Sequence, residues 1–195
     1  MLTGNEKKVL RLLISSFDTD YSINEVAKQC GLAPNGAFKI LKKLEKEGIL
    51  KSKKIANIIS YKIDFENEKT MNVLELALIT DVKGRVKYRY DDLIALKGVA
   101  KACVLFGSHI DLKKEPNDLD ALFILKKDEY REYRKKLMDV KSTLPVRLHD
   151  AVQTEEDLKK NIIGKDKVII DILRNGIVLW GCSAISEAIK DVNRG

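Results

Sequence analysis

The spacing of the apolar residues changes at Gly48, and this change constrains the fold more than any other feature of the sequence. Before it, apolar residues recur every three or four positions, as on the buried face of a helix. After it, residues 49–54 and 58–63 form short runs typical of strands. Ala56 and Asn57 separate these runs, and Asn tolerates a turn. The sequence therefore predicts helices followed by a hairpin.

Three helices are predicted before this hairpin, the first over residues 5–17. The second begins after Ser22, whose hydroxyl can accept from the backbone N–H of Glu25 while the Glu25 side chain bonds back in a capping box. Gly31 ends it, because Gly supplies a turn conformation closed to most residues. The third begins near Pro34, which a first helical turn tolerates. Its apolar positions are Phe38, Ile40, Leu41 and Leu44.

Helix, short helix, tight turn, helix and basic hairpin is the order of a winged helix-turn-helix domain, and residues 5–64 resemble that family. The segment SINEVAKQCGLAPNGAFKILKKLEKEGILKSKK is similar to the turn and recognition helix of many prokaryotic winged-helix regulators. In such proteins the second helix of the motif enters the major groove and the wing contacts the backbone. The resemblance implies duplex DNA as partner. The implied contacts are Asn35, Lys39, Lys42 and Lys43 of the recognition helix with Lys53 and Lys54 of the wing.

The positive charge of the chain is concentrated in the same segment. Residues 1–64 contain 12 Lys and Arg against 7 Asp and Glu, a net charge of +5, whereas the other 131 residues contain 24 against 22. A local excess favours an anionic partner such as nucleic acid. The alternative is a winged helix used for protein contacts, with these lysines as a solvated face. Because Lys supplies phosphate affinity more than base selectivity, we expect weak sequence specificity or a need for dimerisation.

A helical connector is expected over residues 65–97. Residues 71–79 are too apolar for a free linker, Gly84 interrupts the run, and a further helix is expected from Tyr88 to Leu96. The stretch could also be a dimer surface, so we expect a homodimer, although ordinary core packing would account for it equally.

Two motifs beyond the connector suggest a site that binds a metal ion and a phosphate. A short apolar run ends in Gly107-Ser108, and Asp118-Leu119-Asp120 precedes a second apolar run. Residues i and i+2 of a strand point to one side, so Asp118 and Asp120 would project two carboxylates into one place. These repel unless a cation neutralises them, and Mg²⁺ is usually held by one or two carboxylates and substrate phosphates. Gly107 would admit a phosphate to the backbone, and Ser108 begins a turn able to cradle an anion.

The segment LFGSHIDLKKEPNDLDALFIL resembles the nucleotidyltransferase signature, and DILRNGIVLWG is similar to the end of small prokaryotic, archaeal-type members. The resemblance covers roughly residues 98–182. It implies Mg²⁺ and a nucleoside triphosphate as ligands, with Asp118 and Asp120 as metal ligands and catalytic residues. The nucleotide contacts implied are Gly107, Ser108, Lys113 and Lys114.

Two departures from this family concern catalysis. Active members usually carry a third carboxylate on a strand one helix later, here residues 144–152. Arg147 and His149 are expected on the face where that acid would lie, and Arg147 would oppose a metal ion. Asp150 falls on the other face by alternation and could be the third catalytic acid only if the strand end twists. Family members also often carry Arg soon after the Ser, where this chain has His109.

The sequence therefore predicts an α+β protein. It places a winged helix-turn-helix at 1–64, the connector at 65–97, and a nucleotidyltransferase-like mixed sheet flanked by helices at 98–195. The first functional hypothesis is a DNA-binding transcriptional regulator whose second domain binds Mg-nucleotide, with or without catalysis. The second is an active nucleotidyltransferase, antitoxin-like, that transfers a nucleoside monophosphate to a toxin-like protein or a small molecule. The third is a scaffold for protein contacts.

The remaining features of the sequence concern where in the cell the protein is found. No apolar stretch approaches the roughly 18 residues of a membrane span, and the first residues form no apolar signal region. Cys30, Cys103 and Cys182 lie far apart without a CxxC pair, which indicates neither a zinc ribbon nor a disulfide framework. We therefore expect a cytoplasmic protein with no membrane partner.

Overall fold

The computed structural model describes residues 1–16, 19–79, 85–110 and 118–194. The chain divides into two compact units, Met1–Leu78 and Ile79–Gly195. The boundary falls inside the expected connector. Helix α4 (Lys69–Leu78) contacts α1 (Gly4–Ile14) in the first unit, whereas α5 (Arg85–Leu93) belongs to the second. Leu74 of α4 is fully buried, so apolar side chains of this stretch serve core packing.

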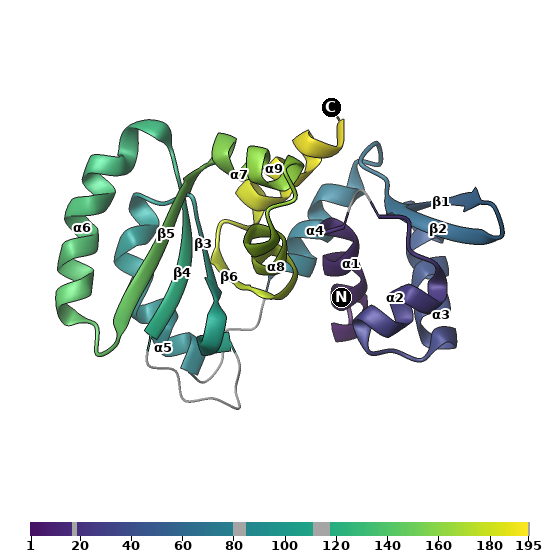
Figure 1. The fold of residues 1–195 in the computed structure, drawn as a ribbon, viewed down its shortest axis with the longest axis horizontal. Coiled ribbons are helices and arrows are strands. Elements are labelled where there is room, and N and C mark those ends of the chain that lie inside the picture. The colour runs from purple at the N-terminus through teal and green to yellow at the C-terminus, as the bar shows by residue number, and fades with distance from the viewer. Residues whose placement is uncertain (17–18, 80–84, 111–117, 195) are drawn as a thin grey trace. The chain divides into compact units, whose positions relative to one another are not determined.

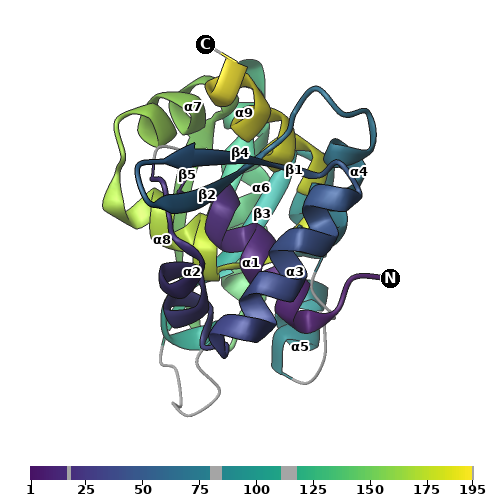
Figure 2. The same ribbon diagram turned by 90° about the vertical axis from the view of Figure 1, so that its right-hand side faces the viewer.

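Helices α1 to α4 and a hairpin form the described part of the first unit (Figures 1 and 2). Helix α1 contacts α2 (Ile23–Cys30) and α3 (Pro34–Lys46), and the antiparallel strands β1 (Leu50–Ile55) and β2 (Ile58–Ile63) follow. The predicted capping box joins Ser22 and Glu25, and Gly31 adopts the left-handed conformation with φ 65°. Local backbone chemistry thus fixes the turn between α2 and α3 as expected.

The turn between β1 and β2 lies at Ala56 and Asn57, as predicted. Ala56, not Asn57, holds the left-handed conformation, with φ 50°. A positive φ at the first central residue of a two-residue turn is the pattern of a type II′ turn, where Gly is favoured because it has no Cβ. Ala56 therefore holds a conformation that costs an L-residue free energy.

A mixed four-stranded sheet forms the centre of the second unit, in the order β5-β4-β3-β6. Strand β3 (Ala102–Phe106) pairs antiparallel with both β4 (Asp118–Leu125) and β6 (Ile177–Trp180), whereas β4 pairs in parallel with β5 (Arg147–Thr154). The parallel pair is joined by α6 (Tyr130–Thr143), as such a pair requires a crossover. A mixed sheet flanked by helices was predicted, and this coarse fold is confirmed.

Helices cover both faces of this sheet (Figure 1). On one face, α5, α6 and the 3-10 helix η1 (Ile94–Gly98) enclose a core that includes Cys103, Phe123 and Tyr133. On the other lie α7 (Glu155–Ile163), α8 (Lys167–Asn175) and α9 (Cys182–Arg194). The indole N–H of Trp180 donates to the Ala100 carbonyl at 2.9 Å, so this side chain is a core residue. Among the described residues, no helix is long and apolar enough to cross a membrane.

Candidate nucleic-acid interface and carboxylate site

Helix α3 presents different residues to the core and to solvent. Ala37, Leu41 and Leu44 are fully buried. At about 100° per residue, the opposite side carries exposed polar residues, namely Asn35, Lys39 and Lys46. Lys46 was not among the predicted contacts, although it lies two turns after Lys39. This outward side of α3 is the surface that a winged helix would offer to a DNA groove.

Lys42 lies on the side of α3 that faces the hairpin. Its Nζ donates to Glu45 Oε2 at 2.8 Å and lies 6.0 Å from the centre of the Tyr61 ring. The hydrogen bond to Glu45 and the proximity of Tyr61 raise the pKa of Lys42. The side chain is still 46 % exposed, so its charge remains accessible to a phosphate.

Lys43 is engaged with α1. Its Nζ donates to Glu6 Oε1 at 2.7 Å and lies 3.8 Å from Glu47. Burial opposes the ionisation of Glu6, but hydrogen bonds from Lys43 and Thr3 outweigh it and lower the Glu6 pKa. The structure thus gives Lys43 a role in joining α3 to α1, while its side chain is 50 % exposed and the DNA contact that the resemblance implied stays a prediction.

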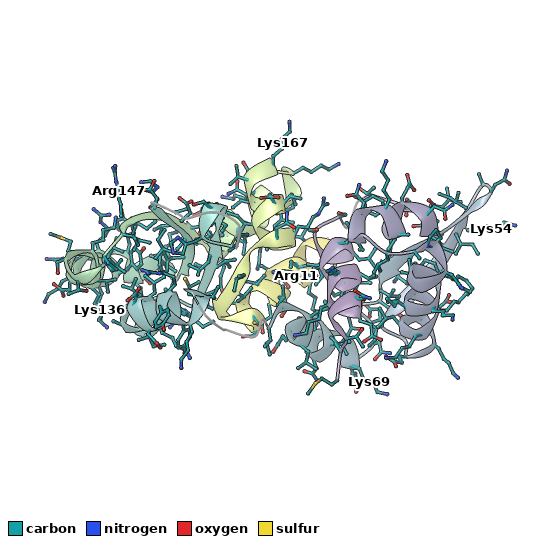
Figure 3. All side chains as sticks on the ribbon, turned by 90° about the horizontal axis from the view of Figure 1, so that it is seen from below. Arg11, Lys54, Lys69, Lys136, Arg147 and Lys167 are labelled. Carbon is teal, nitrogen blue, oxygen red and sulfur yellow. The ribbon has the colours of Figure 1, made fainter. Side chains whose placement is uncertain are left out.

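Lys53 and Lys54 lie on opposite faces of the hairpin. Lys54 pairs with Ile59, and Lys53 pairs with Ser60, whose hydroxyl donates to Asp20 Oδ1 at 3.0 Å. This hydrogen bond and the charges of nearby lysines, Lys53 among them, lower the pKa of Asp20. Figure 3 shows Lys54 projecting outward near the end of the hairpin. The two wing lysines therefore cannot make equivalent contacts with one partner.

A surface hollow of 460 Å³ lies between α2, α3 and the tip of the hairpin. Phe38, Ile58 and Ile59 line it and are 40 %, 37 % and 40 % exposed. From the sequence, Phe38 was predicted only as an apolar position of the helix. Its spacing was the available signal, because Phe38 comes three residues after Asn35 and four before Lys42, on the exposed side of α3.

The predicted carboxylates lie at the start of β4 and are half-buried. Gly107 opens the 3-10 helix η2 (Gly107–Ile110) with φ 69°, and a Cβ there would lie 2.2 Å from Asp120 Oδ2. Gly107 therefore leaves room for the Asp120 carboxylate. His109 is buried, and its Nδ1 lies 3.0 Å from the Asp118 carbonyl oxygen. Because a carbonyl only accepts, Nδ1 carries the proton.

Basic side chains face these carboxylates from β5. The register pairs Asp118 with Arg147 and Asp120 with His149, and His149 Nδ1 lies 3.3 Å from Asp120 Oδ1. Arg147 and His149 are exposed and share one face, as predicted, while Leu148 between them is buried. Figure 3 shows Arg147 projecting away from its strand. Basic side chains thus lie where a third carboxylate was sought.

Asp150 does not join Asp118 and Asp120. It lies on the face of β5 that carries Leu148, where Lys141 Nζ and the Tyr133 hydroxyl donate to its carboxylate. Burial and the charge of Asp150 raise the pKa of Tyr133. The twist that would have brought Asp150 to the other face is absent because α6 holds its side chain.

The magnesium site that the resemblance implied stays a prediction, for which the described residues offer Asp118 and Asp120 at the start of β4. The described residues contain no group of three or more His, Cys, Asp or Glu side chains able to hold a metal ion. Arg147, beside Asp118 in the register, adds a positive charge that opposes a divalent cation. Lys113 and Lys114 lie outside the described residues.

A second hollow, of 420 Å³, lies on the edge strand β5 beside Arg147 and His149. Its lining mixes basic, acidic and apolar side chains: Phe106, Lys141, Arg147, Leu148, His149, Asp150 and Ala151. Lys141 is paired with Asp150, so Arg147 leaves the lining with a net positive charge that suits an anionic ligand better than a cation.

Comparison with known proteins concerns the first unit. The family described as winged helix-turn-helix DNA-binding matches residues 2–51. No curated protein sequence matches the chain. A solved structure, that of the zinc-responsive MarR family member ZitR of Lactococcus lactis, is 20% identical, with coverage of 50% of this chain and 76% of that chain and a TM-score of 0.30, which is too low to establish a shared fold. The family match and the order of α1, α2, α3, β1 and β2 identify the first unit as a winged helix-turn-helix DNA-binding domain.

Proposed function

We propose that the chain is a transcriptional regulator that binds duplex DNA through the outward side of α3 and one face of the hairpin. The observation that carries the proposal is the distribution of lysines in the first unit. Lys39 and Lys46 point away from the core, Lys42 remains exposed beside them, and Lys54 projects from the hairpin. Such cations release counterions from DNA on binding and supply most of the sequence-independent affinity.

The salt dependence of DNA binding tests this proposal. Each phosphate contact contributes about 0.9 to the slope of log affinity against log salt. We expect Lys39→Gln combined with Lys54→Gln to reduce the slope by about 1.8, so the affinity lost between about 50 and 200 mM salt should shrink roughly tenfold. Fluorescence anisotropy with a labelled duplex of mixed sequence measures both quantities.

The matched controls are lysines of the same unit with other surroundings. Lys53→Gln removes a neighbouring charge from the opposite face of the hairpin, and Lys69→Gln removes one from α4. Both should change the slope by much less than Lys54→Gln does. The proposal fails if the wild-type chain shows no salt-sensitive binding, or if all these lysines contribute alike.

A second candidate function concerns the second unit. The hollow beside β5 supports binding of an anionic ligand such as a nucleoside triphosphate, with Arg147 providing positive charge and His149 a hydrogen-bonding group. The turn at Gly107 and Ser108 lies at the end of β3, which β4 separates from β5 in the sheet. Transfer of a nucleoside monophosphate would require metal-holding carboxylates, and the described residues offer Asp118 and Asp120 without a third. Ligand binding without catalysis is therefore the better-supported hypothesis.

Isothermal titration calorimetry with ATP and GTP, with and without Mg²⁺, distinguishes the two hypotheses. Metal-independent binding that Arg147→Gln weakens at least tenfold would support the anion site. Binding that requires Mg²⁺ and disappears when Asp118 and Asp120 are both changed to Asn would favour the nucleotidyltransferase instead. Glu156→Gln, an exposed change on α7, should alter neither result and serves as the control.

A further inference from the structure

The hollow between α2, α3 and the hairpin has an unusual lining for a surface expected to meet phosphates. Phe38, Ile58 and Ile59 together expose large apolar side chains there, and Ile23 and Pro34 extend the apolar surface. Single exposed apolar residues are ordinary, but a cluster of them in one hollow marks a binding surface. The lining also includes the polar residues Ser22, Asn24, Asn35 and Asn57, which can bond to phosphates or base edges. The apolar side chains gain nothing from phosphate oxygens, so they require an apolar group as their partner.

Its position associates the hollow with the DNA-binding surface. Asn35, one of the outward residues of α3, also lines it. Lys42 follows Phe38 by one helical turn and is exposed. Across the hairpin, Lys54 pairs with Ile59 and therefore shares its face. Cations thus border the apolar hollow on the helix and on the wing, which is the charge pattern expected of a surface covered by DNA.

We propose that Phe38, with Ile58 and Ile59 behind it, contacts the C5-methyl groups of thymine, so that the winged helix prefers A·T base pairs. This inference rests on the proposed DNA binding. In the major groove the thymine methyl is the apolar group that a base pair presents, and Phe is among the side chains able to contact it. Asn35, one helical turn before Phe38, is suited to the N6 and N7 atoms of adenine. Asn35 and Phe38 together would recognise both bases of an A·T pair.

This arrangement also explains how a helix rich in lysine could select a sequence. Lysines on the outward side of α3 bind phosphates of any sequence. An apolar side chain gains affinity only where a methyl group is present, because removing that methyl returns the apolar surface to water. Selectivity would therefore depend on Phe38, and affinity at low salt would depend on the lysines.

Two duplexes that differ only in the methyl group provide the test: an alternating dA–dT duplex and an alternating dA–dU duplex of equal length. Burying one methyl group changes affinity about fourfold. The full chain should bind the dA–dT duplex at least about fourfold more tightly. Phe38→Ala should bind both duplexes equally, near the wild-type affinity for dA–dU, with an unchanged salt slope.

Controls separate this inference from general DNA binding and from loss of folding. Leu76→Ala truncates another exposed apolar residue of the same unit and should keep the preference for dA–dT. Ile59→Ala should reduce the preference without abolishing it. If the wild-type chain binds both duplexes equally, or if Phe38→Ala keeps the full preference for dA–dT, the inference is overturned while DNA binding is left intact. If Phe38→Ala then alters only the oligomeric state, the hollow is a surface for protein contacts. Absence of salt-sensitive binding to either duplex overturns both proposals.

Discussion

Replacing Gly107 by Ala should destabilise the second unit through two separable effects. The first is backbone strain, because φ is 69° and a left-handed conformation costs an L-residue about 1–2 kcal/mol. The second is steric, because the new Cβ would lie 2.2 Å from Oδ2 and 3.0 Å from Cγ of Asp120. Asp120 would have to turn away and lose its contact with His149, which is worth about 0.5–1 kcal/mol at a partly exposed position. Together the two effects should lower the free energy of unfolding of the second unit by about 2 kcal/mol.

Trp180 makes this loss measurable in one unit alone. It is the single tryptophan of the chain and is 6 % exposed in the core of the second unit, so its fluorescence reports the unfolding of that unit. Urea titration should show the Gly107→Ala loss of about 2 kcal/mol, and the melting temperature should fall by about 8 °C for a unit of this size.

Two controls identify the cause of that loss. Gly98→Ala adds a methyl whose nearest neighbour would be Lys136 Nζ at 3.7 Å, so the change should stay within about 0.5 kcal/mol. In an Asp120→Ala background, Gly107→Ala should cost only the backbone part, about 1–2 kcal/mol. Equal losses for Gly107→Ala and Gly98→Ala, or an undiminished loss in that background, would refute the reasoning.

Further predictions concern single groups in each unit. Burial raises the pKa of Tyr133. The contribution of the protonated hydroxyl to the free energy of unfolding is therefore complete below about pH 10 and falls above it by about 1.4 kcal/mol per pH unit. Tyr133→Phe should flatten this alkaline decline in stability, measured by urea titrations followed by Trp180 fluorescence. Ala56→Gly should stabilise the hairpin by about 1 kcal/mol, visible as slower hydrogen exchange of its amides, whereas Asn57→Gly should not. The pKa of Glu6 is lowered, so the contribution of its carboxylate to the free energy of unfolding is present above about pH 4.3 and is lost on acidification. Glu6→Gln should lower the free energy of unfolding by about 1 kcal/mol at pH 7. It should also weaken the acid dependence of unfolding followed by circular dichroism.

Local backbone chemistry was the part of the fold most accessible from sequence. The Ser22 capping box and the left-handed Gly31 were predicted because each depends on neighbours within four residues. Alternation likewise placed Arg147 and His149 on one face of a strand. These features follow from side-chain spacing alone, so a single sequence determines them.

Contacts between distant segments were less accessible. The sequence around Lys43 gives no sign of its hydrogen bond to Glu6, which lies 37 residues earlier on another helix. The hairpin turn at Ala56 and Asn57 was predicted correctly, but the positive φ of Ala56 was not foreseen, because Asn tolerates that conformation better than Ala. Phe38 was grouped with core residues because its apolar character, and not its angle on α3, was considered.

The central position of β3 has a consequence for how the chain is synthesised. Its partner β4 follows closely, but β6, which pairs with its other edge, is the last strand of the sheet. While the ribosome makes the intervening helices, one edge of the apolar strand Ala102–Phe106 has no partner, and open apolar edges recruit strands from other chains. Nascent chains that stop before Ile177 should therefore aggregate or engage chaperones through β3, whereas the first unit can already have folded.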